Sequence, residues 1–128
     1  MNVLLTGGAG YIGSHVALSL LDLGHNVHII DNLSTGSEKL IPKNAKFTKC
    51  NINNKNIISD LIKSNEFDLL MHFAGFIQVE ESVKYPQKYF DNNTQNAIKL
   101  FKVCQKNGLN KIVFSSTASA YGKVTGDK

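Results

Sequence analysis

The sequence predicts an α/β fold in which helices cover both faces of a doubly wound parallel sheet. Three observations support this fold class: short apolar runs alternate with helical patterns, most runs are continuously apolar, and four glycines fall within residues 7–13. Continuously apolar strands are typical of parallel sheets that helices bury on both faces. Right-handed crossovers between such strands give an expected strand order of 3-2-1-4-5.

Five segments are expected to form the strands of this sheet. The first is NVLLT, and the second, fourth and fifth are likewise almost entirely apolar, whereas the third, KFTKC, is more polar. The expected strands cover residues 2–6, 26–30, 46–50, 68–73 and 111–116.

Three helical patterns lie between these strands. The first ends before Gly24, which is expected to stop the helix, and a shorter and weaker pattern covers residues 54–65. The longest begins at Pro86, a residue that suits the first helical turn, and closes at Gly108. The expected apolar faces are Ile12, Val16, Leu20 and Leu23 in the first helix, and Phe90, Thr94, Ala97, Phe101 and Cys104 in the longest.

Composition excludes several classes of protein. The 128 residues are 42% apolar and 19% charged, which fits one soluble globular domain. No apolar run reaches the roughly 18 residues of a membrane span, and the apolar opening is too short for a signal peptide, so we expect a cytoplasmic protein. Cys50 and Cys104 show no metal or redox spacing and are expected to be reduced.

The charge pattern gives no indication of a nucleic-acid partner. The net charge is +4, and every basic residue is a lysine, because the chain contains no arginine. The basic stretch from Lys39 to Lys55 lacks the aromatic pattern and the motifs of nucleic-acid binding, and we interpret it as a solvated surface. His25 and His28 have no partner at metal-ligand spacing, so no metal is expected.

The glycine cluster predicts a phosphate-binding turn. Gly8, Gly10 and Gly13 have the G-x-G-x-x-G spacing, and Gly7, Gly10 and Gly13 the related G-x-x-G-x-x-G spacing. Glycine permits the positive dihedral angles of a tight turn, and the missing side chain at Gly10 lets a pyrophosphate approach the backbone. Gly13 is expected to let the helix pack closely on the sheet, and the first helical turn then presents its amides to the phosphates. A purely structural turn is the alternative.

Asp31 ends the second expected strand, at the distance from the glycines where a carboxylate binds the adenosine ribose. Capping of a turn is its alternative role. A carboxylate about 4 Å from a 2′-phosphate repels it by about 4 kcal/mol at an effective dielectric constant of 20. Residues 32–38 contain no cation that would offset this repulsion. The sequence therefore predicts a preference for NAD over NADP.

Small and polar residues follow each expected strand. They are GGAGYIG after the first, DNLSTG at the second, NINN after the third, AGF after the fourth and SSTASAYG at the fifth. The carboxyl ends of parallel strands meet at one edge of a sheet, where the ligands of open sheets bind. We therefore expect these segments to form one crevice.

Five motifs together resemble the extended short-chain dehydrogenases, in particular their nucleotide-sugar 4-epimerase branch. They are TGGAGYIGSH, DNLSTG, HFAGFIQVEESV, YFDNN and FSSTASAYG, and they extend over most of the chain. The resemblance implies a Rossmann fold, a tightly bound NAD, a UDP-hexose substrate and a homodimer. The implied reaction inverts C4 of the hexose through a 4-keto intermediate, with hydride passed to and from NAD.

The resemblance also implies roles for individual residues. Thr117 is implied to be the catalytic hydroxyl that hydrogen-bonds the 4-position of the sugar. Asn51 stands where the family usually has aspartate, and Ile77 where some members have lysine. The expected cofactor-binding residues are Gly7, Gly10, Tyr11, Ile12, Gly13, Asp31, Asn32, Leu33, Ser34, Thr35, Gly36, Asn51, Ile52, Phe73, Ala74, Gly75, Ile77, Asn92 and Ser115.

Within this set, the resemblance distributes the residues along the cofactor. It implies that Tyr11 and Ile12 contact the pyrophosphate through their backbone, and that Ser115 lies near nicotinamide. Asp31 and Asn32 are implied to bind the adenosine ribose, Asn51 and Ile52 to flank adenine, Phe73, Ala74 and Gly75 to lie beneath the cofactor, and Asn92 to reach it from the long helix.

One family feature is absent from the sequence: the Tyr-x-x-x-Lys pair, in which lysine lowers the pKa of tyrosine. The tyrosines at 85, 89 and 121 are followed four positions later by tyrosine, asparagine and threonine. We therefore expect residues 1–128 to be an NAD-binding Rossmann domain, an inactive fragment of a longer enzyme whose substrate domain lies outside it. Another NAD-dependent nucleotide-sugar epimerase or dehydratase and a non-catalytic NAD-binding module are the alternatives.

The histidines and serines give no independent catalytic signal. His72 lies among apolar residues of the fourth expected strand, which favours a packed core histidine over a catalytic one. Ser115, Ser116 and Ser119 lack a histidine and an acid arranged to activate them, so a hydrolase is not expected.

Overall fold

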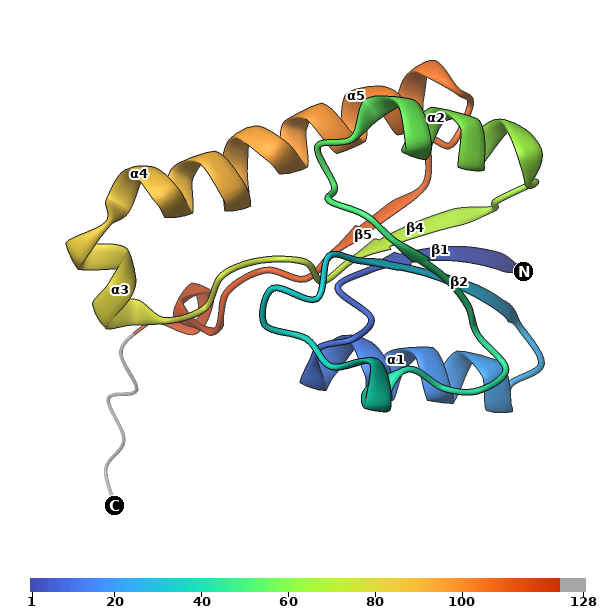
Figure 1. The fold of residues 1–128 in the computed structure, drawn as a ribbon, viewed down its shortest axis with the longest axis horizontal. Helices are drawn as coiled ribbons and strands as arrows, with labels where there is room; N and C mark the ends of the chain where they lie inside the picture. Colours follow the sequence, from blue (N-terminus) through green and yellow to red (C-terminus); the bar gives the residue numbers. More distant parts are fainter. Residues whose placement is uncertain (123–128) are drawn as a thin grey trace.

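A parallel sheet organises the structure, a computed structural model that describes residues 1–122. Its strand order, β3-β2-β1-β4-β5, confirms the predicted order. The central strand β1 pairs with β2 on one side and β4 on the other. The strands are β1 (Asn2–Thr6), β2 (Asn26–Asp31), β3 (Lys46–Lys49), β4 (Leu69–His72) and β5 (Ile112–Phe114) (Figure 1).

The last three strands are shorter than the segments predicted for them. Single hydrogen bonds continue beyond the carboxyl end of each of the three, because Cys50 N donates to Asp31 O at 3.1 Å, Phe73 N to Thr6 O at 2.9 Å and Ser115 N to His72 O at 3.0 Å. A residue with one such bond no longer belongs to a regular strand. The predicted strands 46–50, 68–73 and 111–116 therefore extend past the observed ends.

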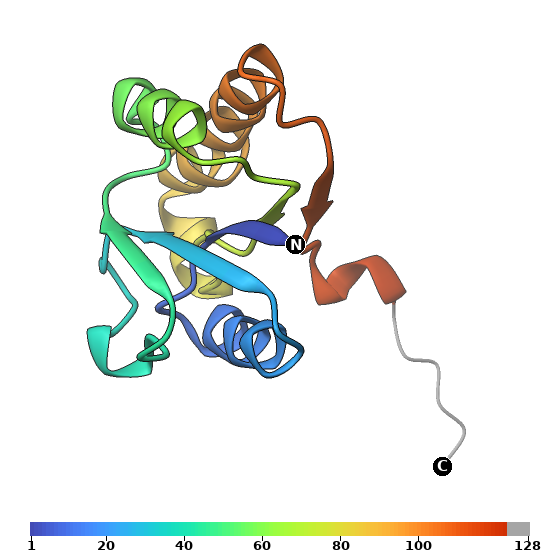
Figure 2. The ribbon, with the colours of Figure 1, turned by 90° about the vertical axis from the view of Figure 1, so that its right-hand side faces the viewer.

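Helices cover both faces of the sheet. They are α1 (Tyr11–Asp22), α2 (Lys55–Ser64), α3 (Val79–Lys84), α4 (Pro86–Tyr89) and α5 (Ala97–Lys106), with a π-helical segment η2 (Phe90–Asn96) and two 3₁₀ segments, η1 (Glu38–Leu40) and η3 (Ala118–Tyr121). α1 lies on one face, whereas α2 and α5 pack against each other on the opposite face (Figures 1 and 2). α3 and α4 lie beyond the carboxyl ends of the strands (Figure 1).

The predicted apolar face of α1 is only half correct. Val16 and Leu20 pack against the sheet, but Ile12 is 59% and Leu23 72% exposed. Small residues face inward instead, because the start of this helix lies directly against the glycine turn. The buried residues of α1 are Gly13, Ser14 and Ala17.

The predicted long helix is divided into α4, η2 and α5. It begins at Pro86 as expected, but its middle is π-helical. A π turn holds more residues than an α turn, so it rotates the side chains that follow and breaks the predicted periodicity. Ala97 and Cys104 are buried as predicted, whereas Phe90 (52% exposed) and Thr94 lie outside the core.

The weaker helical pattern at residues 54–65 is confirmed as α2. Asn54 caps this helix, since its Oδ1 accepts a hydrogen bond from Ile57 N at 3.2 Å. Ile58 and Ile62 form its buried face. The short helix α3 was not predicted.

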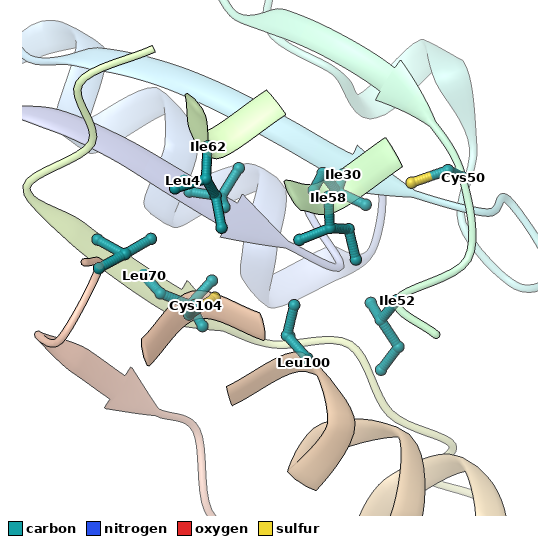
Figure 3. Close-up of a cluster of buried hydrophobic side chains, with 10 residues drawn as sticks. Leu4, Ile30, Cys50, Ile52, Ile58, Ile62, Leu70, Leu100 and Cys104 are labelled. Carbon is teal, nitrogen blue, oxygen red and sulfur yellow. The ribbon is translucent and has the colours of Figure 1, made fainter. Parts of the chain in front are cut away.

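The sheet separates two clusters of buried side chains. The smaller cluster lies under α1 and consists of Leu5, Ala17, Val27 and Ile29. The larger lies between the sheet, α2 and α5 (Figure 3), and it contains Leu4, Ile30, Cys50, Ile52, Ile58, Ile62, Leu70, Leu100, Cys104 and Leu109. β5 is much less covered, because its three residues are 37% to 52% exposed.

The fourth strand ends in a buried histidine. His72 is 2% exposed, and its Nδ1 lies 2.6 Å from Thr6 Oγ1. Its ring stacks on Phe114 and meets Phe101 edge-on, with ring centroids 5.6 Å and 5.4 Å away. Burial lowers the pKa of His72 to about 4, so the ring is neutral at pH 7. His72 is therefore a core residue, as predicted.

Both cysteines are buried free thiols, which agrees with the prediction that they are reduced. Burial raises the pKa of Cys50, and it raises the pKa of Cys104 to about 11. Within the described part of the chain, no helix combines the length and apolarity that a membrane crossing requires. Nor do residues 1–122 bring three potential metal-ligating side chains together.

Candidate functional site

A cleft lies at the carboxyl edge of the sheet, where the sequence predicted a crevice. Its walls are the glycine turn after β1, the loop after β2, the residues after β3 and the segment after β4, with one side chain from η2. The fifth predicted segment, SSTASAYG, contributes no residue to this lining. The lining residues are Gly7, Gly10, Ile30, Asp31, Asn32, Ser34, Thr35, Gly36, Cys50, Asn51, Ile52, Phe73, Ala74, Gly75, Phe76 and Asn92.

Gly7 forms the first bend of the glycine turn. Its φ of +75° lies in the left-handed region that favours glycine. A Cβ atom at this position would lie 2.5 Å from Ala74 N and 2.7 Å from Phe73 C, both in the segment after β4. Gly7 N also donates to Ile30 O at 2.9 Å. Both the dihedral angle and the space therefore require glycine here.

Gly13 brings α1 against the turn. A Cβ atom there would overlap Gly7 O and lie 3.0 Å from the Cα atom of Gly8. The close approach of α1 that was predicted from Gly13 is therefore made to backbone atoms of the turn that follows β1. Gly8 lies against the sheet itself, since a Cβ atom there would lie 2.6 Å from the side chain of Ile29 in β2.

The start of α1 is suited to an anion. Its N-cap is Gly10, which has no side chain to cap the helix, and the first turn contains no acidic residue. Gly10 N donates to Gly7 O, and Ser14 N donates to Gly10 O. The amides of Tyr11, Ile12 and Gly13 have no acceptor within the helix, because they precede its first internal hydrogen bond. These amides and the helix dipole favour a phosphate at this position.

Asp31 joins the end of β2 to the glycine turn. Its Oδ2 accepts a hydrogen bond from Ala9 N at 3.0 Å, and its Oδ1 accepts one from Leu33 N at 2.8 Å. The alternative role considered for this residue, capping a turn, is therefore present in the structure. Each carboxylate oxygen can accept further hydrogen bonds, so the side chain is still able to bind hydroxyl groups in the cleft.

The loop after β2 folds over the same turn. Ser37 N donates to Ala9 O at 2.9 Å, and a Cβ atom at Gly36 would lie 2.8 Å from the side chain of Ala9. Leu33 has a φ of +60°, a conformation that a non-glycine residue seldom adopts and that the bond to Asp31 supports. Asn32 stabilises the next bend, because its Oδ1 accepts from Ser34 N at 2.9 Å.

The residues after β3 form the adjacent end of the cleft. Asn51 is half-buried, and its Oδ1 accepts a hydrogen bond from Asn53 N at 3.1 Å. Ile52 is 6% exposed and belongs to the larger core cluster. Cys50 also lines the cleft, although the sequence indicated only a core or strand residue.

The segment after β4 is fixed by an asparagine that was not among the predicted site residues. Asn93 Oδ1 accepts from Phe76 N, and Asn93 Nδ2 donates to Phe76 O, both at 2.8 Å. Asn92 Nδ2 donates to Asn93 Oδ1 at 2.9 Å, and Asn92 lines the cleft as expected. The only sequence signal for Asn93 was its place in the YFDNN motif.

Several predicted residues lie outside the lining. Tyr11 and Ile77 are 77% and 89% exposed. Thr117 is exposed after β5, and its Oγ1 accepts from Ser119 N at 3.1 Å. Ser115 follows β5, and its N donates to the O atom of His72 at 3.0 Å, so Ser115 lies beside the carboxyl end of β4. The others outside the lining are Ile12, Gly13 and Leu33.

Three lining residues were not predicted: Ile30, Cys50 and Phe76. Ile30 and Cys50 also belong to the core cluster, and apolar periodicity cannot separate a core residue from one that additionally faces a cleft. Phe76 stands between two residues that were selected, and its aromatic side chain was the available signal.

Comparison with known proteins identifies the family. The sequence matches the NAD dependent epimerase/dehydratase family over residues 3–128. A UDP-glucose 4-epimerase from Lacticaseibacillus casei is 44% identical over 123 residues, which cover 96% of this chain and 37% of that protein. A bifunctional UDP-glucose 4-epimerase and UDP-xylose 4-epimerase from Pisum sativum is 39% identical, and the match covers 94% of this chain and 38% of that protein. The chain thus spans well under half the length of these relatives.

Solved structures share the fold. A UDP-glucose 4-epimerase from Stenotrophomonas maltophila, with bound NAD and formylated UDP-arabinopyranose, has a TM-score of 0.91 at 36% identity, covering 98% of this chain and 40% of that one. The Brucella ovis UDP-glucose 4-epimerase in complex with NAD has a TM-score of 0.90 at 34% identity, covering 95% of this chain and 37% of that one. Since the family match extends over nearly all its residues, this chain belongs to the NAD dependent epimerase/dehydratase family.

Proposed function

We propose that this chain binds NAD in the cleft and is the cofactor-binding Rossmann domain, residues 1–128, of a UDP-glucose 4-epimerase. This enzyme activity interconverts UDP-galactose and UDP-glucose. The observation that carries the proposal is the junction of the glycine turn with Asp31, through the 3.0 Å hydrogen bond from Ala9 N to Asp31 Oδ2. This junction supports the proposal because it brings the backbone amides of the glycine turn beside a carboxylate, in a chain 44% identical to a UDP-glucose 4-epimerase.

The cleft fits a dinucleotide at three points. The uncapped start of α1 offers backbone amides to a diphosphate, and no side chain at Gly7 or Gly10 obstructs the approach. Asp31 accepts hydrogen bonds from a ribose at the end of β2. Asn51 and Ile52 provide an amide and an apolar surface for adenine at the neighbouring strand end.

The residues of this chain bind and orient, and they supply little of the chemistry themselves. When bound, NAD supplies the group that accepts a hydride from C4 of the sugar and returns it. Phe73, Ala74 and Gly75, which line the cleft, would lie beneath the cofactor, and Asn92 would reach it from η2. We propose Thr117 as the hydroxyl that hydrogen-bonds the sugar at its 4-position, and Ser115 as a neighbour of nicotinamide.

Cofactor binding tests the first part of the proposal. Titration calorimetry with the chain should give measurable affinity for NAD and about a thousandfold weaker affinity for NADP, because Asp31 repels a 2′-phosphate by about 4 kcal/mol. Asp22, an exposed aspartate, provides the matched control for a substitution of Asp31. Asp22→Asn should leave both affinities unchanged. Equal or tighter binding of NADP would contradict the proposed role of Asp31.

Activity tests the second part. A longer protein that contains this chain and supplies a Tyr-x-x-x-Lys pair should convert UDP-galactose to UDP-glucose in a coupled assay. The family also includes dehydratases, so release of a 4-keto-6-deoxy sugar nucleotide would favour that second function. The homodimer and a place in galactose metabolism are proposed from the resemblance, and a cytoplasmic location is proposed from the sequence.

A further inference from the structure

Phe76 is one of two aromatic residues in the cleft wall that follows β4; the other, Phe73, packs against the smaller core cluster. If Asp31 binds the adenosine ribose and the glycine turn binds the diphosphate, the remaining half of a dinucleotide extends across β4 toward this wall. Adjacent strands lie about 4.8 Å apart, so the order β2-β1-β4 carries the ligand stepwise from Asp31 to Phe76. The ring of Phe76 therefore belongs to the part of the cleft that faces the nicotinamide half.

Two side chains from α4 hold the Phe76 ring. Lys88 Nζ lies 4.9 Å from the ring centroid, within the range of a cation–π interaction. The Tyr89 ring contacts the Phe76 ring, with the two centroids 5.5 Å apart and the ring planes tilted by 57°. The Phe76 backbone is held separately by Asn93.

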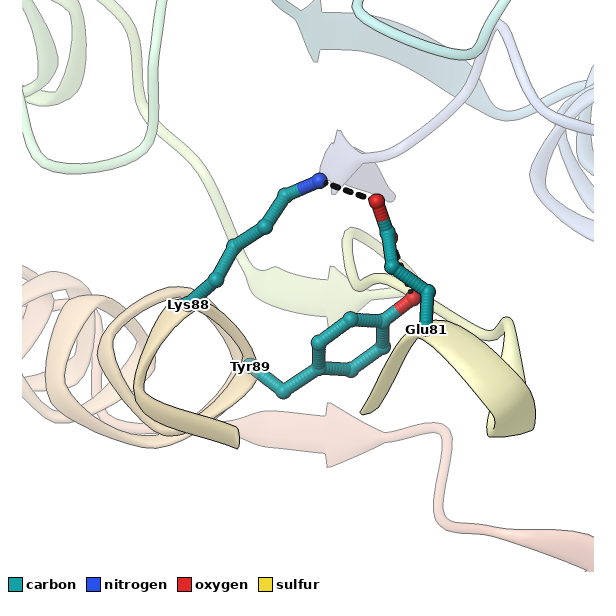
Figure 4. A network of polar contacts seen from close by, with 3 residues as sticks. All are labelled: Glu81, Lys88 and Tyr89. Carbon is teal, nitrogen blue, oxygen red and sulfur yellow. Dashed lines mark hydrogen bonds and ion pairs between the residues drawn. The ribbon is translucent and has the colours of Figure 1, made fainter. Parts of the chain in front are cut away.

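Glu81 in α3 binds both of these side chains. Its Oε1 accepts from Lys88 Nζ at 2.6 Å, and its Oε2 accepts from the Tyr89 hydroxyl at 2.7 Å (Figure 4). The contact with Lys88 is also an ion pair. Bonds from Lys88 and Tyr89 lower the pKa of the Glu81 carboxyl below its ordinary value, so it is ionised at neutral pH.

Glu81 is positioned to accept hydrogen bonds from both Lys88 and Tyr89. Lys88 and Tyr89 are neighbours on one short helix, and each has a long side chain with several rotamers. An acceptor with two oxygens fixes both side chains at once, because each oxygen binds one donor. The side chain of Glu81 is 31% exposed and that of Lys88 47%, so each is partly shielded from water.

We propose that Glu81 is a positioning residue for the NAD site: by binding Lys88 and Tyr89 together, it holds the Phe76 ring in place against the nicotinamide half of the cofactor. This inference rests on the proposed function, because it assigns a role within the same cleft. Glu81 itself is not a lining residue of the cleft, and its action passes through the Phe76 ring.

The test separates the two halves of the cofactor. Affinities of the chain for NAD and for ADP are measured by calorimetry, because ADP contains the adenosine and diphosphate but no nicotinamide. Glu81→Ala should weaken NAD binding about fivefold and change ADP binding less than twofold, in keeping with the modest effect of a partly exposed ion pair. Glu81→Gln, which keeps the shape and one acceptor, should fall between wild type and Glu81→Ala.

A neighbouring residue provides the matched control. Glu80 lies in the same turn of α3, is exposed, and forms no side-chain hydrogen bond or ion pair within residues 1–122. Glu80→Ala should bind NAD and ADP as the wild type does. Equal losses of NAD and ADP affinity in Glu81→Ala would show a general structural defect, and unchanged NAD affinity would show no role; either result overturns the inference.

A second measurement needs no ligand and separates this inference from the proposed function. NMR of the wild-type chain should show contacts between the Phe76 ring protons and the ε-methylene of Lys88, and these contacts should disappear in Glu81→Ala. Their persistence in a folded variant overturns the positioning role. If the contacts behave as expected but the wild type binds neither NAD nor ADP, the proposed function is wrong, and the role of Glu81 toward the cofactor is wrong with it.

Discussion

The two walls of the cleft are built in different ways. On the glycine side, backbone atoms are in direct contact: there is no room for a Cβ atom at Gly13 against Gly7, or at Gly7 against the segment after β4. On the opposite side, side chains connect separate segments, with Asn93 bound to the Phe76 backbone and Glu81 to two residues of α4. The first wall depends on glycines, which have no side chain, and the second depends on hydrogen bonds made by side chains.

This difference explains which wall the sequence reveals. A backbone contact requires glycine at fixed positions, so it appears as a spacing within seven residues. A side-chain connection joins residues 7 to 17 positions apart, and asparagine, glutamate or lysine at such positions is common in any soluble protein. The glycine wall should therefore tolerate almost no substitution. In the other wall, each substitution should remove one connection and loosen only the segment that it held.

The largest effect is expected from Gly13→Ala. The new methyl group would overlap Gly7 O, and backbone atoms on both sides leave it no flexible neighbour to displace. We expect the free energy of unfolding to fall by about 4 kcal/mol, above the usual cost of overpacking because only backbone atoms could move aside, and NAD binding to be lost. Urea unfolding followed by circular dichroism measures the first effect, and calorimetry the second.

Gly75→Ala is the matched control for folding. Its Cβ atom would have nothing closer than Asn93 Oδ1 at 3.5 Å, an ordinary van der Waals distance, and its φ is not positive. The stability of this variant should stay within about 1 kcal/mol of the wild type. If the two alanine variants unfold alike, the contrast between the walls does not hold.

A smaller effect is expected when the pH is lowered. The pKa of His72 is lowered by burial from 6.5 to about 4, so the folded state favours the neutral ring. Its contribution to stability is fully present above pH 6.5 and is lost as the pH falls through the folded pKa, because the unfolded chain then binds the extra proton. The loss is about 3 kcal/mol below pH 4. Unfolding free energies measured from pH 7.5 to pH 4 check this prediction.

The acid effect should also reveal the contrast between the walls. His72 contacts Thr6 at the end of β1 and the rings of Phe101 in α5 and Phe114 in β5, so amide exchange at these residues should rise before that of Gly10 and Gly13. His72→Asn removes the titrating group and should flatten the pH dependence relative to the wild type. An unchanged pH slope in this variant would assign the acid sensitivity to other groups.

An intermediate effect on binding is expected from Asp31→Asn. The amide keeps the size of the side chain and one acceptor, but it removes the charge and places a donor group near Ala9 N or Leu33 N. We expect NAD affinity to fall about tenfold and the preference for NAD over NADP to shrink by about a hundredfold. Calorimetry with both cofactors measures the two ratios. A preserved preference would mean that Asp31 does not face the ribose.

Much of the fold and the glycine half of the site followed from the sequence, because they depend on local patterns. Apolar runs located the strands, and the glycine spacing with Asp31 located one wall of the cleft. The π-helical segment was missed because it lies inside a continuous helical pattern, and local periodicity does not record where a helix changes its winding. Phe76 was not selected because its importance depends on which segments the fold brings beside it.

The smallest effect is expected from Asn93→Ala, which removes a side-chain connection from the wall opposite the glycine turn. Both hydrogen bonds to Phe76 and the one from Asn92 are lost, but no buried charge is exposed and no backbone clash is created. We expect the free energy of unfolding to fall by about 1 kcal/mol. Amide exchange at Phe76 should rise more than at the strands, since the segment after β4 opens locally.

Asn107 offers a matched control at the far end of α5. Its side chain makes two hydrogen bonds, one fewer than that of Asn93, accepting from Ser59 Oγ at 3.2 Å and donating to Val103 O at 2.8 Å. Asn107→Ala should therefore lower the unfolding free energy by a similar amount without changing exchange at Phe76 or the affinity for NAD. If the two variants change exchange at Phe76 equally, Asn93 supports only the fold in general. A change confined to Asn93→Ala shows that this wall is held by individual side chains, as its geometry indicates.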